Sequence, residues 1–374
     1  MSGTSLDGID AALVEIRPNR GGYAIALRRF VTAPFDDDLH LAVERALPPE
    51  RGSVAEAAEL HHRLGRAFAD AALAVMQDER AGYVASHGQT LWHDGTANVT
   101  LQLGDPFIIR EATGASVCYD FRSADCAVGG SGAPLVPYVD ALLFRSRDED
   151  RVAVNIGGIA NLTALPKNSG AIIAFDTGPG NMLIDVLVRE RTHGVERCDQ
   201  DGATALRGRI DEGLLHAMLG DPYFSQAPPK STGRERFGAQ FLRQHSEIDK
   251  LSLEDALATL TELTAVSIGN AIASLKLERP RVIVSGGGAH NRTLFARLAA
   301  RLPKAVVECS DRMGISPDAK EAIAFAVLGY ETLRERIANV PSVTGAQRAV
   351  PLGAIAPLRL RELLSTIDLE CRSQ

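Results

Sequence analysis

The sequence contains few cysteines, few aromatic residues and no surplus of positive charge. Its five cysteines are an odd number, scattered along the chain, and no CxxC pair occurs among them. A disulfide framework and a zinc site are therefore both disfavoured, and we expect a reducing compartment, the cytoplasm. The net charge of −7 argues against a protein that binds nucleic acid through a basic surface.

Long apolar runs and the commonest nucleotide-binding motifs are also missing. We find no apolar run of membrane-spanning length and no secretory signal, so we expect no membrane partner. The chain lacks GxxxxGK[ST], which argues against a Walker-type loop, and GxGxxG, which weakens a dinucleotide fold. What remains, 374 residues of which 45% are hydrophobic and 23% charged, is typical of a globular protein of two domains.

The first ten residues, MSGTSLDGID, concentrate small, hydroxylated and glycine residues ahead of an apolar strand from Ala11 to Ile16. Such a turn leaves backbone N–H groups open to phosphate oxygens. Asp7 stands beside this cradle, where a magnesium ion would sit. An ordinary polar hairpin turn is the alternative, and a short motif of this kind does not decide between the two.

Two further glycine clusters follow apolar strands. Residues 152–163, VAVNIGGIANLT, place Gly157 and Gly158 between two strands, although for this segment alone a plain hairpin is the favoured interpretation. Residues 281–288, RVIVSGGG, run from a strand into Gly286, Gly287 and Gly288 and then into a helix. Bare backbone at the carboxyl end of a strand is where ligands bind in α/β folds. Similar turns opening each half of the chain predict two similar domains around a nucleotide.

A carboxylate at the end of a strand is the best candidate for a catalytic base. In residues 172–181, IIAFDTGPGN, an apolar strand ends at Asp176, directly before a glycine-rich opening and the start of a helix. A base at this position could take a proton from an attacking oxygen during phosphoryl transfer. A role as a helix or turn cap is the alternative for an aspartate in this setting.

Other polar segments could contact a substrate. SHGQT at 86–90 and DFRSADCAVGGSGAPLVP at 120–137 combine polar side chains with strand ends and glycines, and PKSTGRERFG at 229–238 could bind a carboxylate or phosphate. The alternatives are a structural histidine, surface ion pairs and, for Glu321 in an apolar helix, a solvated helix edge. The candidate substrate contacts are His87, Gln89, Thr90, Arg122, Asp125 and Glu321.

The order of predicted elements indicates an α/β fold. Strands alternate with helices in both halves, which favours mixed sheets. The charged segment 145–151 predicts a domain boundary, with domains at 1–147 and 148–374. We leave open that the last segment returns to the first domain.

Taken together and in order, the motifs resemble the anhydro-N-acetylmuramic acid kinase family. The motifs are MSGTSLDGID, SHGQT, LQLGDP, DFRSADCAVGGSGAPLVP, NIGG, FDTGPGN, PKSTGRERF and SGGGAHN, and the likeness extends to PLGAIAP at 351–357. The family belongs to the superfamily of acetate and sugar kinases, heat-shock chaperones and actin. The resemblance implies a two-domain actin-like ATPase fold, ribonuclease H-like, with ATP in the interdomain cleft.

The resemblance also implies the chemistry. Family members open the 1,6-anhydro bridge of the sugar with water and phosphorylate O6 with ATP, giving N-acetylmuramic acid 6-phosphate for cell-wall recycling. Asp176 matches the family's catalytic aspartate and would deprotonate the water. The expected ATP-binding residues are Ser2, Gly3, Thr4, Ser5, Leu6, Asp7, Gly8 and Ile9, with Gly157, Gly158, Gly286, Gly287 and Gly288. Asp7 is the expected Mg²⁺ ligand, and a homodimer is left open.

Two departures and two alternatives accompany this resemblance. Ser131 stands where the family usually has glutamine, and the sequence lacks the short strand that usually precedes the first motif. A kinase of a simpler anhydrosugar such as levoglucosan is one alternative. A nucleotide-switched binding protein of the chaperone or actin type is the other, although it would not need the acidic pocket around residues 120–125.

Overall fold

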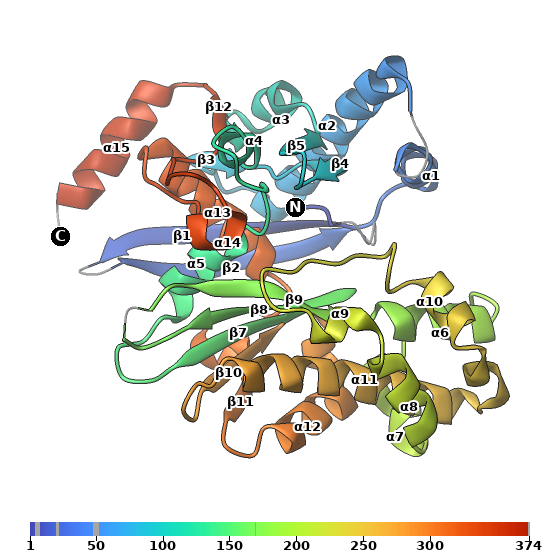
Figure 1. The fold of residues 1–374 in the computed structure, drawn as a ribbon. Helices are drawn as coiled ribbons and strands as arrows, with labels where there is room; N and C mark the ends of the chain where they lie inside the picture. The colour runs from blue at the N-terminus through green and yellow to red at the C-terminus, as the bar shows by residue number, and fades with distance from the viewer. Residues whose placement is uncertain (4–7, 20–21, 48–51, 169, 373–374) are drawn as a thin grey trace. The chain divides into compact units, whose positions relative to one another are not determined.

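The computed structural model describes residues 1–3, 8–19, 22–47, 52–168 and 170–372. The chain folds into two compact units, of which the first comprises Met1–Leu143 and Ala319–Gln374 and the second Phe144–Asp318 (Figure 1). The chain therefore leaves the first unit near the predicted boundary. It returns at Ala319, so the second unit is shorter than the expected domain 148–374.

The second unit is built on a five-stranded mixed sheet with the strand order β11-β10-β7-β8-β9. Its strands are β7 (Arg151–Ile156), β8 (Ile159–Leu165), β9 (Ile173–Pro179), β10 (Arg281–Ser285) and β11 (Val306–Cys309). Strands β7, β8 and β9 form an antiparallel meander, and β10 and β11 add in parallel on the other side of β7. This is the strand order of a ribonuclease H-like domain, which confirms the fold class expected from the sequence.

Helices supply the rest of the second unit's core. They are α6 (Met182–Arg191), α7 (Ala203–Arg207), α8 (Glu212–Leu219), α9 (Pro222–Ser225), α10 (Ala239–Gln244), α11 (Leu253–Ser274) and α12 (Arg292–Arg301). Helix α11 packs with Ala265 and Ile268 in the cluster on the sheet, and with Leu260 in the cluster formed by the other helices. It therefore joins these two hydrophobic clusters.

Helix α11 also corrects one expectation from the sequence. By length and apolar content it is one helix that could cross a membrane, although we expected no run of that length. Glu262 interrupts the apolar pattern of α11, and its carboxylate pairs with Arg301 at 2.6 Å. Because 83% of the apolar window is buried inside the protein, α11 is explained as a core helix.

Among the described residues, the strands of the first unit form three small sheets. The strands are β1 (Ile9–Asn19), β2 (Gly22–Ala33), β3 (Tyr83–Ala85), β4 (Gln89–Asp94), β5 (Val99–Leu103), β6 (Ser116–Tyr119) and β12 (Ala354–Ala356). Strands β1 and β2 form the expected antiparallel pair, β4 and β5 a second, and β12-β6-β3 a three-stranded sheet. The last sheet pairs the C-terminal strand β12 with β6, so residues beyond Ala319 complete this unit.

The helices of the first unit cover these sheets. They are α1 (Asp37–Ala46), α2 (Val54–Met76), α3 (Pro106–Thr113), α4 (Ser123–Cys126), α5 (Val136–Phe144), α13 (Lys320–Leu333), α14 (Pro341–Thr344) and α15 (Leu360–Arg372). Helix α2 begins with a capping box between Ser53 and Glu56, which fixes its start, and buries Leu64 and Phe68. Its apolar face packs in one cluster with Ile9 of β1 and Val117 of β6.

Candidate active-site residues of the two units

Asp176 is held on β9 by the polar segment 229–238. Its carboxylate Oδ2 accepts a hydrogen bond from the backbone N–H of Thr232 at 2.9 Å. The Tyr223 hydroxyl donates to the backbone oxygen of Asp176 at 2.7 Å, and the Asp176 N–H donates to the carbonyl of Lys230 at 3.2 Å. A neighbouring loop thus orients the Asp176 side chain. This side chain does not cap α6, whose N-cap residue is Asn181.

The surroundings of Asp176 make it a stronger base than an ordinary aspartate. Burial raises the pKa of its carboxyl to about 6, against the lowering effect of the Thr232 hydrogen bond, and the nearby negative charge of Glu235 raises it further. At neutral pH the group is still mostly ionised. A pKa close to the working pH is what proton abstraction requires.

The turn between β7 and β8 is pressed against the start of α6. The N–H groups of Gly180 and Asn181 donate to the carbonyls of Gly158 and Gly157, both at 2.8 Å. A Cβ on Gly180 would lie 2.2 Å from the Gly157 oxygen, so only glycine fits there. Because β7 and β9 run in the same direction, these glycines lie at one edge of the sheet.

The glycines after β10 reach the same edge. Gly286 has a φ of +79°, and a Cβ there would lie 2.8 Å from the Ile156 carbonyl oxygen at the end of β7. A Cβ on Gly288 would lie 2.3 Å from the Ile156 side chain. Packing against Ile156 therefore explains why residues 286 and 288 are glycines. It does not explain Gly157 or Gly287, where an added Cβ would meet nothing closer than 3.7 Å and 3.9 Å.

In the first unit, Gln89 joins the two described ends of the first glycine-rich segment. The Ser2 hydroxyl lies 2.6 Å from Gln89 Oε1 and 3.3 Å from the Gly8 carbonyl oxygen, and Gln89 Nε2 donates to the Gly3 carbonyl at 3.4 Å. Gln89 is fully buried, so it supports this segment. Of the expected phosphate-binding residues, Thr4, Ser5, Leu6 and Asp7 lie outside the described residues, whereas Ile9 begins β1 in the core.

His87, which is buried, pairs with Arg122, which is partly buried. The His87 ring donates from Nδ1 to the Gly88 carbonyl at 2.8 Å and accepts from Arg122 Nε at 3.0 Å. Burial and the Arg122 charge hold the pKa of His87 well below its usual range, so the ring is neutral and orients the guanidinium. Arg122 also donates to the Gly132 carbonyl at 2.8 Å. Burial lowers the pKa of Arg122 to about 10, opposed by the charge of Glu321, so Arg122 stays charged at neutral pH.

Asp125 has a different role from the substrate contact that the sequence led us to expect. It is fully buried and accepts hydrogen bonds from Asn339 at 2.7 Å, Thr344 at 2.9 Å and the Gly132 N–H at 2.9 Å. These contacts tie the glycine loop 129–132 to the C-terminal part of the first unit. The geometry therefore makes Asp125 a positioning residue.

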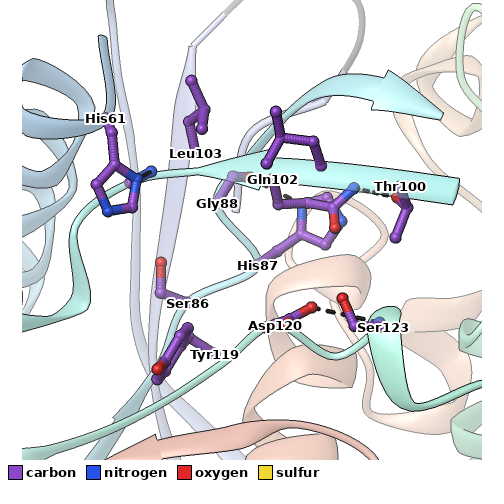
Figure 2. Close-up of a pocket in the computed structure, with 12 residues that line it drawn as sticks. His61, Ser86, His87, Gly88, Thr100, Gln102, Leu103, Tyr119, Asp120 and Ser123 are labelled. Atoms are coloured by element: carbon purple, nitrogen blue, oxygen red, sulfur yellow. Dashed lines mark hydrogen bonds between the residues drawn. The ribbon is translucent and has the colours of Figure 1, made fainter. Parts of the chain in front are cut away.

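A small pocket lies beside His87 in the first unit. It has a volume of about 130 Å³, and Figure 2 shows His87, Asp120 and Ser123 around it, with His61 of α2 at its far side. The hairpin β4–β5 contributes Thr100 and Gln102, and Gln102 donates to the Thr90 hydroxyl at 3.3 Å. The lining combines these polar side chains with Leu101 and Leu103, an arrangement that suits a ligand with hydroxyl groups.

Comparison with known proteins decides the family. A family model described as anhydro-N-acetylmuramic acid kinase matches residues 1–358. The chain belongs to the anhydro-N-acetylmuramic acid kinase family. A relative of this name from Gloeobacter violaceus is 44% identical over 375 residues, covering 96% of this chain and 97% of the relative. Another from Streptomyces coelicolor is 42% identical over 368 residues, covering 96% and 93%. The resemblance and the kinase class predicted from the sequence are thereby confirmed.

This member of the family is also distantly similar to solved structures of other proteins. A ROK family glucokinase from Streptomyces griseus, in complex with glucose and AMPPNP, has a TM-score of 0.36 and 9% identity, covering 86% of this chain and all of that one. A likeness of this size carries no argument about function. The fold class of this kinase-family chain stands instead on the strand order of its second unit.

The pocket of this kinase-family chain includes residues that sequence reasoning did not select. Thr100 and Gln102 line it, yet neither was a candidate substrate contact, whereas Asp120 and Ser123 belong to the segment 120–137 that was expected to contact a substrate. A signal existed, because LQLGDP at 101–106 was among the family motifs and Asp120 opens the DFRSAD segment. The pairing of β4 with β5, which brings Gln102 opposite Thr90, is what gives these residues a shared location.

Among the described residues, no group of three or more His, Cys, Asp and Glu side chains could hold a metal ion. Mg²⁺ is usually held by one or two carboxylates together with substrate phosphates and water, so a site made wholly of protein groups is not needed.

Proposed function

We propose that this protein is an ATP-dependent kinase that opens 1,6-anhydro-N-acetylmuramic acid with water and phosphorylates O6. The product is N-acetylmuramic acid 6-phosphate, made in the cytoplasm during recycling of the cell wall. The observation that carries the proposal is the setting of Asp176, an oriented carboxylate with a pKa raised to about 6. Family membership supplies the identity of the sugar.

The proposed reaction couples one displacement at C1 of the sugar to one phosphoryl transfer. Asp176 accepts a proton from water as the water oxygen forms a bond to C1 of the sugar. The C1–O6 bond breaks, and its electron pair passes to O6. O6 then forms a bond to the γ-phosphorus of ATP, and ADP leaves. Such a transfer depends on positioning and charge neutralisation more than on covalent chemistry by the protein.

The glycines support a nucleotide at the sheet edge of the second unit. Gly157 and Gly287 lack side chains although the protein leaves room for them, which is expected where a ligand approaches the backbone closely. We assign Gly157, Gly158 and the glycines 286–288 to ATP, together with the segment 2–9. We assign Asp7 to Mg²⁺, which would offset the negative charge of the phosphates when bound.

The sugar is assigned to polar groups of the first unit. Arg122, charged and fixed by His87, suits the lactyl carboxylate of the substrate, which levoglucosan lacks. Glu321 lies close enough to Arg122 to influence its pKa, so the two groups can act on one ligand. Thr90 and the pocket lined by Gln102 and Asp120 would receive hydroxyl or amide groups.

A coupled assay of ADP release tests the proposal. The enzyme is supplied with ATP and Mg²⁺ and with 1,6-anhydro-N-acetylmuramic acid, levoglucosan or no sugar. We expect rapid ADP release with the muramic sugar alone. Preference for levoglucosan would assign a simpler anhydrosugar kinase, and equal slow release in all three arms would assign a nucleotide-switched binding protein.

A further inference from the structure

Helix α13 of the first unit begins with a buried lysine that the proposed reaction does not use. The Lys320 ammonium donates to Asp140 Oδ1 of α5 at 3.1 Å, and each residue is only 2% exposed. Both residues stand next to the places where the chain leaves and re-enters the first unit, after Leu143 and before Ala319. The pair therefore joins the last helix before the chain leaves this unit to the first helix after it returns.

Stability alone is a poor explanation for this pair. Burying an ammonium group costs hydration energy that its partner rarely repays in full, and an apolar pair of similar size is often as stable. Lys320 also lies in the first turn of α13, where the helix dipole disfavours a cation. The N-cap residue Ala319 offers no side-chain hydrogen bond. A costly group at such a place indicates that the geometry it fixes has a use.

The Lys320–Asp140 pair fixes the direction of the neighbouring residue, Glu321. Successive residues of a helix point about 100° apart, so Lys320 directed at α5 leaves Glu321 and Phe325 on a common face. The Phe325 ring lies 4.6 Å from the His87 ring, between centroids. One turn later, a Cβ on Gly329 would lie 2.9 Å from Ala85 of β3, so this face of α13 lies close against the sheet. Glu321 is thus directed toward the group formed by His87 and Arg122.

We infer that the Lys320–Asp140 pair positions Glu321 for the sugar by fixing the first turn of α13 against α5. This inference rests on the proposed function, because it takes Glu321 as a substrate contact. Asp140 and Lys320 are positioning residues that act through Glu321.

A double variant separates positioning from folding. K320M/D140L replaces the buried pair by apolar side chains of similar size, so it should fold and melt near the wild-type temperature. We expect kcat/KM for the anhydrosugar to fall about 10- to 100-fold, as small displacements of a binding group do, while the KM for ATP changes little. The conservative K320R should retain most activity. The control R63M/D38N removes an ion pair in which Asp38 is 88% exposed and should leave all rates unchanged.

A second readout does not depend on activity. Titration of the Glu321 carboxyl is followed by carbon-13 NMR of glutamate-labelled enzyme, with E321Q assigning the signal. Among the described residues, the charged groups that act on Glu321 include Lys320, Asp10, Arg122 and the Met1 ammonium. Loss of the Lys320 cation and of its anchoring should raise the pKa of Glu321. An unchanged titration overturns the inference whatever the rates, whereas a wild-type enzyme inert toward the anhydrosugar overturns the proposed function and leaves the titration to decide.

Discussion

At the scale of single residues, Asp176 shows how a protein can place a carboxylate where it is unfavourable but useful. Its oxygen is fixed by Thr232 and its backbone by Tyr223, while burial opposes its ionisation. Substitution by asparagine tests the base role alone. Its amide has nearly the same shape as the carboxylate but cannot take the proton.

Asp176→Asn should reduce turnover by about 10²- to 10⁴-fold, the usual effect of losing a general base. ATP affinity, measured by calorimetry, should stay near the wild-type value. The control Asp148→Asn changes an exposed carboxylate of the charged segment 145–151 and should have no effect. Turnover of Asp176→Asn within a few-fold of wild type would remove this residue from the mechanism.

The rate should also report the raised pKa of Asp176. Because the base must be ionised, kcat/KM should fall as pH decreases through a value of about 6. A rate that stays constant from pH 7 down to the ordinary aspartate range would contradict this assignment.

Stability should change in the opposite direction to activity. The folded-state pKa of Asp176 lies above its ordinary value, so the folded state favours the neutral carboxyl. Its contribution is fully present below the unfolded pKa near 4 and is lost as pH rises through about 6. At pH 7, Asp176→Asn should therefore raise the free energy of unfolding by roughly 1–3 kcal/mol. Urea titrations at pH 4 and pH 7 measure this, and a gain equal at both pH values would count against it.

At the scale of secondary-structure elements, the sheet edge of the second unit depends on glycines of two kinds. Gly180 is required by packing, because its neighbour is a backbone oxygen that cannot move away. An added Cβ on Gly157 would meet nothing closer than 3.7 Å, and we propose that a ligand approaches the backbone there. The segments that carry the two glycines are hydrogen-bonded to each other. Substitutions at Gly180 and Gly157 can therefore be compared in nearly the same surroundings.

Gly180→Ala should destabilise the protein by about 1–3 kcal/mol, the cost of overpacking, and lower ATP affinity with it. Gly157→Ala should leave the melting temperature almost unchanged but weaken ATP binding severalfold, because its methyl group would stand where the phosphates approach. Thermal melts and calorimetry on both variants check this. Wild-type ATP affinity in Gly157→Ala would place the phosphates elsewhere.

Much of the element order could be predicted from local patterns. The alternation of apolar residues in 152–163 predicts the hairpin β7–β8, and the apolar run before Asp176 predicts β9. Both patterns can be read because each is contained within a few consecutive residues. The role of Asp125 could not be found this way. Its partners Asn339 and Thr344 lie far along the chain, and only the fold of the first unit brings them to it.

At the scale of the whole molecule, neither unit alone contains every group that the proposed reaction needs. Asp176 and the glycines that we assign to ATP, 157, 158 and 286–288, belong to the second unit. His87, Arg122 and Glu321 belong to the first. The chain passes between the units after Leu143 and returns before Ala319. We therefore expect the units to close on the substrates, which would also limit attack of stray water on ATP.

Small-angle X-ray scattering should show this closure. The radius of gyration should be smaller with a nonhydrolysable ATP analogue and the anhydrosugar than in the free enzyme. The analogue alone serves as the control for nucleotide-driven change. Identical scattering profiles in the free and doubly bound states would contradict closure and favour a rigid site.

The most direct test of the central claim follows the oxygen of water. The reaction is run with ATP and 1,6-anhydro-N-acetylmuramic acid in water enriched in oxygen-18, and the product is analysed at once by fragment mass spectrometry. We expect a product with a single labelled oxygen on C1 and an unlabelled phosphate ester at O6, and almost no product with Asp176→Asn. Label in the phosphate group, or a phosphorylated sugar with its anhydro bridge intact, would contradict this expectation.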